Sequence, residues 1–228
     1  METYTLKVIA RIHTDLPEKF GVPRQSGLIP QLRGRIVFEP EYRSIDALRG
    51  LEEFSHLWLV WQFSKATRDT WSPLVRPPRL GGNEKMGVFA TRSPFRPNAL
   101  GLSCVELDRV EQTRDLGPLI HVRGVDLMDG TPIFDIKPYL PYADSRPDAC
   151  GGWTDAVERT QLTVEFPADL LEKIPQEQQE AVYAVLEADP RPRYQEDPQR
   201  IYGLTFARRN IKFRVDGETL YVVEVEMA

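Results

Sequence analysis

Short segments with strand patterning, separated by proline and glycine, run through most of the chain and constrain its fold more than any other feature. Apolar and polar residues alternate from Tyr4 to Ile12, and the apolar, aromatic run Ser55–Phe63 predicts a fully buried strand. Strands and helices do not alternate regularly, so a doubly wound sheet is disfavoured. The pattern predicts a mainly β fold, a β-barrel or sandwich, with further strands at 34–39, 87–91, 100–110, 119–125 and 133–136.

The pattern changes after about residue 166. Asp169–Ala188 has an imperfect apolar face typical of one long helix, and strand-like segments on either side of Asp216 and Gly217 predict a β-hairpin. We therefore expect an N-terminal β-barrel or sandwich domain over residues 1–150, a linker and connecting strand over 151–166, and a small α+β C-terminal domain over 167–228.

The composition fits a soluble globular protein, since 41% of the 228 residues are hydrophobic and 28% are charged. No apolar run approaches the roughly 18 residues of a membrane span, and the first residues lack the apolar centre of a signal peptide. We expect a cytoplasmic protein. Cys104 and Cys150 are the only cysteines and the three histidines are isolated, so a disulfide scaffold and a metal site are not expected.

Positive charge is concentrated in two segments of a chain whose net charge is −5. Residues 68–96 contain six basic and two acidic side chains, and residues 191–214 contain seven basic and two acidic ones. Such islands in an acidic chain favour a local anionic partner. Ordinary solvated arginines are the alternative explanation.

Several common catalytic motifs are absent. The chain has no glycine fingerprint for dinucleotides, no P-loop and no serine elbow. Three other segments carry more polar and proline residues than a core requires: VPRQ at 22–25, GVFATRSPFRPNALGLS at 87–103 and DLMDGTPIFDIKPYLPYADS at 126–145. They indicate either a site built from rigid loops or polar loops that merely cap a barrel.

These motifs, together with LEEFSHLW at 51–58 and VRPPRLGGN at 75–83, resemble the tRNA methyltransferase O family. The resemblance is dense over about the first 150 residues and looser beyond them. It implies a β-barrel methyltransferase that uses S-adenosylmethionine (SAM), forms a homodimer and acts on tRNA. The implied target is the 6-amino nitrogen of the threonylcarbamoyl-modified adenosine at position 37, next to the anticodon.

The resemblance also implies which residues bind the cofactor. They are Arg24, Gln25, Ser26, Ser64, Lys65, Arg92, Leu102, Asp129, Gly130, Thr131 and Pro132. These residue types suit SAM, because its adenine needs an apolar neighbour such as Leu102 and its carboxylate needs a cation such as Arg92. The glycine in the turn permits close approach of the backbone.

The remaining roles follow from chemistry. Methyl transfer to an amine that bears a hydrogen needs a proton acceptor, and Asp126, Asp135 and Tyr139 are the candidates. Arg191, Arg193 and Tyr194 lie in a proline-rich turn that could contact RNA, although the two arginines could instead pair with the acidic helix before them. The apolar strand Trp58–Phe63 also favours a dimer. The alternatives are a non-enzymatic nucleotide- or RNA-binding module and a methyltransferase of another substrate.

Overall fold

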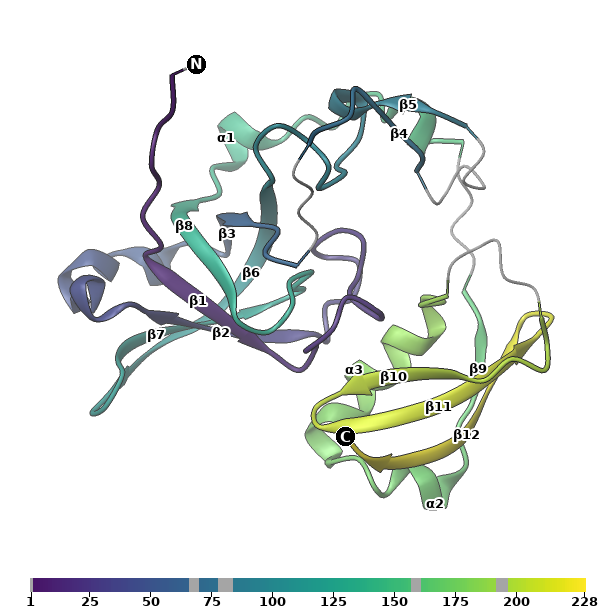
Figure 1. The fold of residues 1–228 in the computed structure, drawn as a ribbon. Helices are drawn as coiled ribbons and strands as arrows, with labels where there is room; N and C mark the ends of the chain where they lie inside the picture. The colour runs from purple at the N-terminus through teal and green to yellow at the C-terminus, as the bar shows by residue number, and fades with distance from the viewer. Residues whose placement is uncertain (1, 66–69, 78–83, 157–160, 192–196) are drawn as a thin grey trace.

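The computed structural model describes residues 2–65, 70–77, 84–156, 161–191 and 197–228. Its N-terminal part is a closed six-stranded barrel in the order β1-β2-β7-β6-β3-β8, in which all neighbouring strands are antiparallel (Figure 1). The expected mainly β fold with a barrel is therefore confirmed. Its strands are β1 (Ala10–Thr14), β2 (Arg33–Phe38), β3 (His56–Gln62), β6 (Leu100–Thr113), β7 (Gly117–Arg123) and β8 (Thr131–Pro138).

Alternation within each strand fills the barrel. Along β3, Leu57, Leu59 and Trp61 point inward and are buried, whereas Trp58 and Val60 lie on the outer face and are half-buried. The prediction that this strand is buried on both faces was wrong, because a barrel wall has only one face toward the core. A count of apolar residues cannot distinguish this strand from one buried on both faces, because the residues on its outer face are apolar too.

The first strand is also displaced from its expected position. Pairing with β2 and β8 begins at Ala10 and continues to Thr14, while Tyr4 and Leu6 are 79% and 53% exposed. The predicted alternation therefore corresponds to a buried face at Ala10 and Ile12, which are fully buried, but not at Tyr4 and Leu6.

A small lobe lies above the barrel in Figure 1. It contains the two-stranded pair β4 (Leu74–Val75) and β5 (Met86–Gly87), followed by a 3-10 turn at Val88–Ala90 where a strand was expected. The short helix α1 (Pro141–Asp144) follows β8. Other 3-10 turns are Pro40–Tyr42, Ile45–Leu48, Leu51–Glu53 and Gly152–Thr154.

The C-terminal part is a four-stranded sheet in the order β10-β11-β12-β9 with two helices. The strand β9 (Thr163–Glu165) pairs in parallel with β12, so the sheet begins before residue 167. The predicted hairpin is confirmed, with a turn at Gly217 (φ +56°). The elements are β9, β10 (Tyr202–Phe206), β11 (Arg209–Asp216), β12 (Thr219–Met227), α2 (Ala168–Leu171) and α3 (Gln176–Glu187).

The single long helix expected at 169–188 is two helices. Pro175 stands at the N-terminal cap of α3, where its extended backbone separates α3 from α2. Proline lacks a backbone N–H and disfavours helical backbone in the residue before it, which explains the break. Within the described part of the chain, no helix is both long and apolar enough to cross a membrane.

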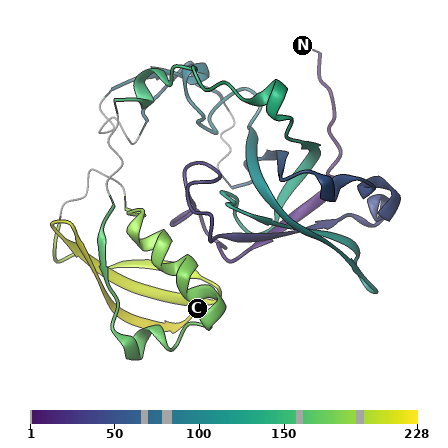
Figure 2. The same ribbon diagram turned by 180° about the vertical axis from the view of Figure 1, so that it is seen from behind.

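The two parts pack against each other through the end of β1 and the loop after it (Figure 2). The Asp15 carbonyl accepts the Ala207 N–H at 2.9 Å, and Gln178 Nε2 donates to Asp15 Oδ1 at 3.1 Å. Gly21 has φ +89°, and an added Cβ would lie 2.3 Å from a Leu204 methyl group. Only glycine satisfies both the backbone angle and this close approach.

Candidate functional site

One end of the barrel gathers most of the residues implied by the family resemblance. In an antiparallel barrel, the last residues of β1, β3 and β7 lie beside the first residues of β2, β6 and β8. The segment Arg24–Ser26 precedes β2, Ser64 and Lys65 follow β3, and the Asp129–Pro132 turn enters β8. Chain segments distant in sequence thus meet at one rim.

Hydrogen bonds join the segment Arg24–Ser26 to the loop before β6 and to β6 itself. The Arg92 guanidinium donates to the Gln25 side-chain oxygen, and Gln25 donates in turn to the Arg24 carbonyl. The Cys104 N–H of β6 donates to Ser26 Oγ at 3.0 Å. Cys104 lies past the end of the pairing between β6 and β7, whose last pair is Glu106 with Arg123. Arg92 itself is exposed, so a cation stands at the rim beside polar groups.

The Asp126 carboxylate lies behind this segment. Ser103 is fully buried on the inner face of β6 and donates its hydroxyl to Asp126 Oδ1 at 2.6 Å. Burial raises the pKa of Asp126 from 3.8 to about 6, although Ser103, the backbone of Asp126 and of Ser26, and the charge of Arg92 all favour the carboxylate. Burial therefore destabilises the ionised Asp126 carboxylate, and the nearby donors offset part of this effect.

Trp61 completes this network from β3. Its Nε1–H donates to Ser103 Oγ at 2.9 Å inside the barrel, and its ring packs against Phe63 with 4.4 Å between centroids. Gly101 is the cross-strand partner of Trp61, and an added Cβ there would lie 2.2 Å from the indole. Sequence analysis did not select Ser103 or Trp61, because their contact depends on the register of β3 and β6.

The turn into β8 is anchored on β1. Asp129 Oδ1 accepts the Thr14 N–H and lies 3.1 Å from His13 Nδ1. The Gly130 N–H donates to the Ile12 carbonyl at 2.8 Å, and Gly130 has φ +75°. Thr131 is buried, with its hydroxyl donating to the Met128 carbonyl. The Asp129–Pro132 turn is thus held in one conformation.

Lys65 and Leu102 occupy different faces of the rim. Lys65 Nζ donates to the Pro17 carbonyl at 3.0 Å, in the loop that follows β1. Leu102 points outward from β6 and is 55% exposed, and its cross-strand partner on β3 is Val60. Val60 is in turn opposite Asp135 of β8, so these three side chains form a row on the outer face.

The three candidate proton acceptors are not together. Asp126 lies inside the rim, and Asp135 lies on the outer face, where it forms an ion pair with Lys137 at 2.9 Å. Tyr139 lies toward the opposite end of the barrel, where its ring contacts His56 and Trp58. The geometry brings Asp135 to the same face as Leu102 and leaves Tyr139 apart from the other site residues.

The proposed RNA contacts are only partly described. The Arg191 guanidinium forms two hydrogen bonds with the Asp189 carboxylate, at 2.9 and 3.0 Å, and its side chain is 12% exposed. Arg193 and Tyr194 lie outside the described residues. Asp189 lies after α3 and outside the helix 169–188 that the alternative named, so Arg191 pairs with a neighbouring acid in its own turn.

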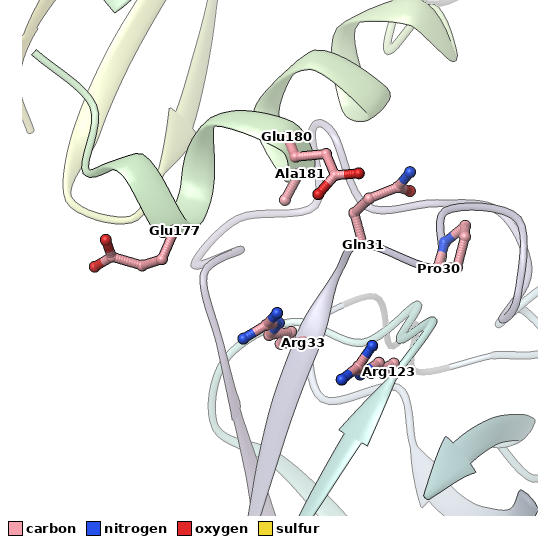
Figure 3. A pocket seen from close by; sticks show the side chains of 7 residues that line it. All are labelled: Pro30, Gln31, Arg33, Arg123, Glu177, Glu180 and Ala181. Atoms are coloured by element: carbon pink, nitrogen blue, oxygen red, sulfur yellow. The ribbon is translucent and has the colours of Figure 1, made fainter. Parts of the chain in front are cut away.

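A pocket of about 250 Å³ lies between the barrel and α3 (Figure 3). Arg33 and Arg123 line it from the barrel, and Glu177 and Glu180 line it from the helix. The described residues that line it include none of the implied cofactor contacts. Arg33 is the first residue of β2 and Arg123 the last residue of β7, so this pocket lies at the same end of the barrel as the rim, on residues other than the implied cofactor contacts.

The rim suits SAM in the kinds of groups it offers. Arg92 supplies a cation for a carboxylate and Leu102 an exposed apolar surface, whereas the backbone N–H groups of Asp129, Gly130 and Thr131 are already hydrogen-bonded within the protein. Among the described residues, no group of three or more His, Cys, Asp or Glu side chains could hold a metal ion.

Comparisons with known proteins agree with the fold. Residues 11–145 match the tRNA-methyltransferase O N-terminal domain, and residues 159–228 match the C-terminal domain of the same family. The tRNA (adenine(37)-N6)-methyltransferase of Escherichia coli is 40% identical over 234 residues, covering 99% of each chain. A putative S-adenosylmethionine-dependent methyltransferase of Pseudomonas aeruginosa is 41% identical and covers 89% of this chain and 88% of its own.

A solved structure gives the same result. The crystal structure of TrmO from Pseudomonas aeruginosa superimposes with a TM-score of 0.80 at 32% identity, covering 100% of this chain and 99% of that one. Fold and rim together define a β-barrel protein with a small α+β C-terminal domain and a candidate ligand site at one end of the barrel. The chain belongs to the tRNA-methyltransferase O family, which confirms the family predicted from its motifs.

Proposed function

We propose that this protein is a SAM-dependent methyltransferase that acts on the 6-amino nitrogen of adenine 37 in tRNA. The observation that carries the proposal is the barrel rim, where Arg24–Ser26, Arg92 and the Asp129–Pro132 turn converge in a chain that matches a tRNA (adenine(37)-N6)-methyltransferase along 99% of its length. We further propose that the adenine carries the threonylcarbamoyl group that the family resemblance implies. SAM supplies an electrophilic methyl group on a sulfonium.

Arg92 is proposed to bind the carboxylate of SAM. Its guanidinium is exposed and already donates to the Gln25 oxygen, an acceptor that a carboxylate could join or replace. Arg92→Ala should weaken SAM binding by about 1.5 to 3 kcal/mol, the usual size of a charge-assisted hydrogen bond. Titration calorimetry on the folded variant measures this, and an unchanged dissociation constant would exclude Arg92 from the site.

Asp135 is the proposed proton acceptor. Methyl transfer makes a nitrogen–carbon bond and breaks a sulfur–carbon bond, and the proton on the nitrogen must pass to an acceptor. Asp135 is 47% exposed and is two strands from Leu102, about 10 Å at the usual strand spacing. Asp126 is mostly buried and Tyr139 packs against Trp58, so both are less accessible to a nucleobase.

The tRNA and dimer contacts are also proposals. The Arg191–Asp189 pair fixes the described end of the segment that continues to Arg193 and Tyr194, which we propose for anticodon-arm contact. A homodimer is supported by the exposed, stacked rings of Trp71 and Phe89, 6.4 Å apart on the lobe. Cytoplasmic localisation follows from a tRNA substrate.

The deciding experiment is methyl transfer from labelled SAM to purified tRNA, with and without the threonylcarbamoyl modification. Product carrying the label at adenine 37 of modified tRNA supports the proposal. SAM binding without transfer to any RNA would support a non-enzymatic module, and transfer only to another acceptor would support a methyltransferase of a different substrate. Sedimentation should give twice 26.2 kDa for the dimer.

A further inference from the structure

Asp126 is only partly exposed and lies directly behind the segment Arg24–Ser26. Ser103, which donates to its Oδ1, is fully buried, and Asp126 itself is mostly buried. The backbone of Ser26 and of Asp126 also favours the ionised form of the carboxylate. A mostly buried carboxylate surrounded by donors is better placed to hold a loop than to receive a proton from substrate.

The segment that it holds has no regular secondary structure of its own. The segment Arg24–Ser26 lies between β1 and β2, and its described connections to the barrel run through Ser26, Gln25 and the adjacent Gly27, whose N–H donates to the Gly124 carbonyl at 2.8 Å. Asp126 is two residues beyond Gly124. The carboxylate and this backbone bond therefore fasten the same loop to the end of β7.

The other side of the carboxylate is fixed from inside the barrel. Ser103 Oγ accepts a hydrogen bond from Trp61 Nε1, which leaves its own hydroxyl proton to be donated to Asp126. The indole is itself fixed by packing over Gly101. The chain Trp61–Ser103–Asp126–Ser26 therefore connects the barrel core to the loop at the rim.

We propose that Asp126 is a positioning residue, which anchors the cofactor-binding segment Arg24–Ser26 to the barrel core through Ser103 and Trp61. The inference rests on the proposed function only in assigning SAM to that segment. Among the described residues, Arg92 is the charged group that acts on the Asp126 carboxylate, and Ser103, Trp61 and Ser26 are its neutral neighbours. Protonation of Asp126 as the pH falls through about 6 should loosen the loop and weaken SAM binding.

The first test uses SAM binding and turnover with Asp126→Asn and the matched control Asp135→Asn. Asp126→Asn should raise the SAM dissociation constant about tenfold at pH 7.5, and kcat at saturating SAM should change less than threefold. It should also remove the weakening of SAM binding at acidic pH. Asp135→Asn should show the reverse, with normal SAM affinity and a large loss of kcat.

The second test needs no cofactor. Hydrogen–deuterium exchange in the peptide that covers residues 20–28 should be faster in Asp126→Asn than in the wild type. Trp61→Phe, which keeps a ring but removes the N–H, should give a smaller change in the same direction. Ser103→Ala should disrupt the same connection as Asp126→Asn and Trp61→Phe. When it is combined with either variant, the change in exchange should therefore differ from the sum of the two separate changes.

The outcomes separate the inference from the proposed function. Wild-type protein that fails to bind SAM contradicts the proposed function, while faster loop exchange in Asp126→Asn would still support the anchor. Normal SAM affinity with lost kcat in Asp126→Asn would overturn the inference and make Asp126 the proton acceptor. Unchanged exchange at residues 20–28 would overturn it as well.

Discussion

Asp126→Asn should change how the stability of the protein depends on pH. In the folded state the pKa of Asp126 is raised from 3.8 to about 6 by burial. The folded protein therefore holds this proton more tightly than the unfolded chain, and the unfolding free energy falls as pH rises through this window. Above about pH 6 the folded state bears the whole cost of the buried charge.

The size of the effect follows from the shift. About two pKa units correspond to about 3 kcal/mol, of which about 2 kcal/mol should develop between pH 4.5 and pH 7.5. Asparagine is neutral throughout, so it escapes this cost. The stability of Asp126→Asn relative to wild type should therefore rise by about 2 kcal/mol between these two pH values. Changes in hydrogen-bond geometry from the amide do not vary with pH and cancel from this difference.

Urea unfolding of both proteins at several pH values measures this difference directly. Asp135→Asn is the matched control, because its carboxylate is 47% exposed in an ion pair with Lys137 and should contribute less than about 1 kcal/mol at either pH. A stability difference between Asp126→Asn and wild type that is flat with pH would refute the reasoning. An opposite slope would mean that the donors around Asp126 outweigh its burial.

Two further predictions concern packing. Gly101→Ala should destabilise the protein by about 2 to 4 kcal/mol in denaturant unfolding, because the new methyl group would displace the Trp61 ring and break its bond to Ser103; a loss under about 0.5 kcal/mol would show that the indole has room to move. Arg191→Ala should cost about 1 to 3 kcal/mol of stability, because it leaves the Asp189 carboxylate without its two hydrogen bonds; weaker tRNA binding at unchanged stability would instead support a direct RNA contact.

Local signals in the sequence predicted local structure well. The hairpin around Gly217 was predicted because a turn dipeptide separates two strand patterns, and both signals lie within a few residues. Pro175 shows the opposite case, since an apolar periodicity on both sides of it suggested one helix. The strand pattern alone predicted a barrel or a sandwich, because the pairing of Ala10 with Ile133 that closes the barrel spans most of the domain. The family resemblance implied the barrel.

The site was predictable in composition but not in arrangement. The family resemblance selected Arg92 and Gln25, which the structure joins by a hydrogen bond. It gave no reason to select Ser103. The role of this serine depends on its hydrogen bond with Trp61 of the neighbouring strand β3. Contacts across strands depend on register, which no single segment of sequence contains.

The alternation of side chains along β6 separates two tasks at the rim. Leu102 points outward to the face that also carries Asp135, while the next residue, Ser103, points inward to Asp126. Neighbours in sequence thus act on opposite sides of the barrel wall. A change at Leu102 alters an exposed surface, whereas a change at Ser103 alters the position and charge of the mostly buried Asp126 carboxylate. A single strand can therefore provide both a binding surface and its internal support, because alternate residues from Gly101 to Val105 face the core.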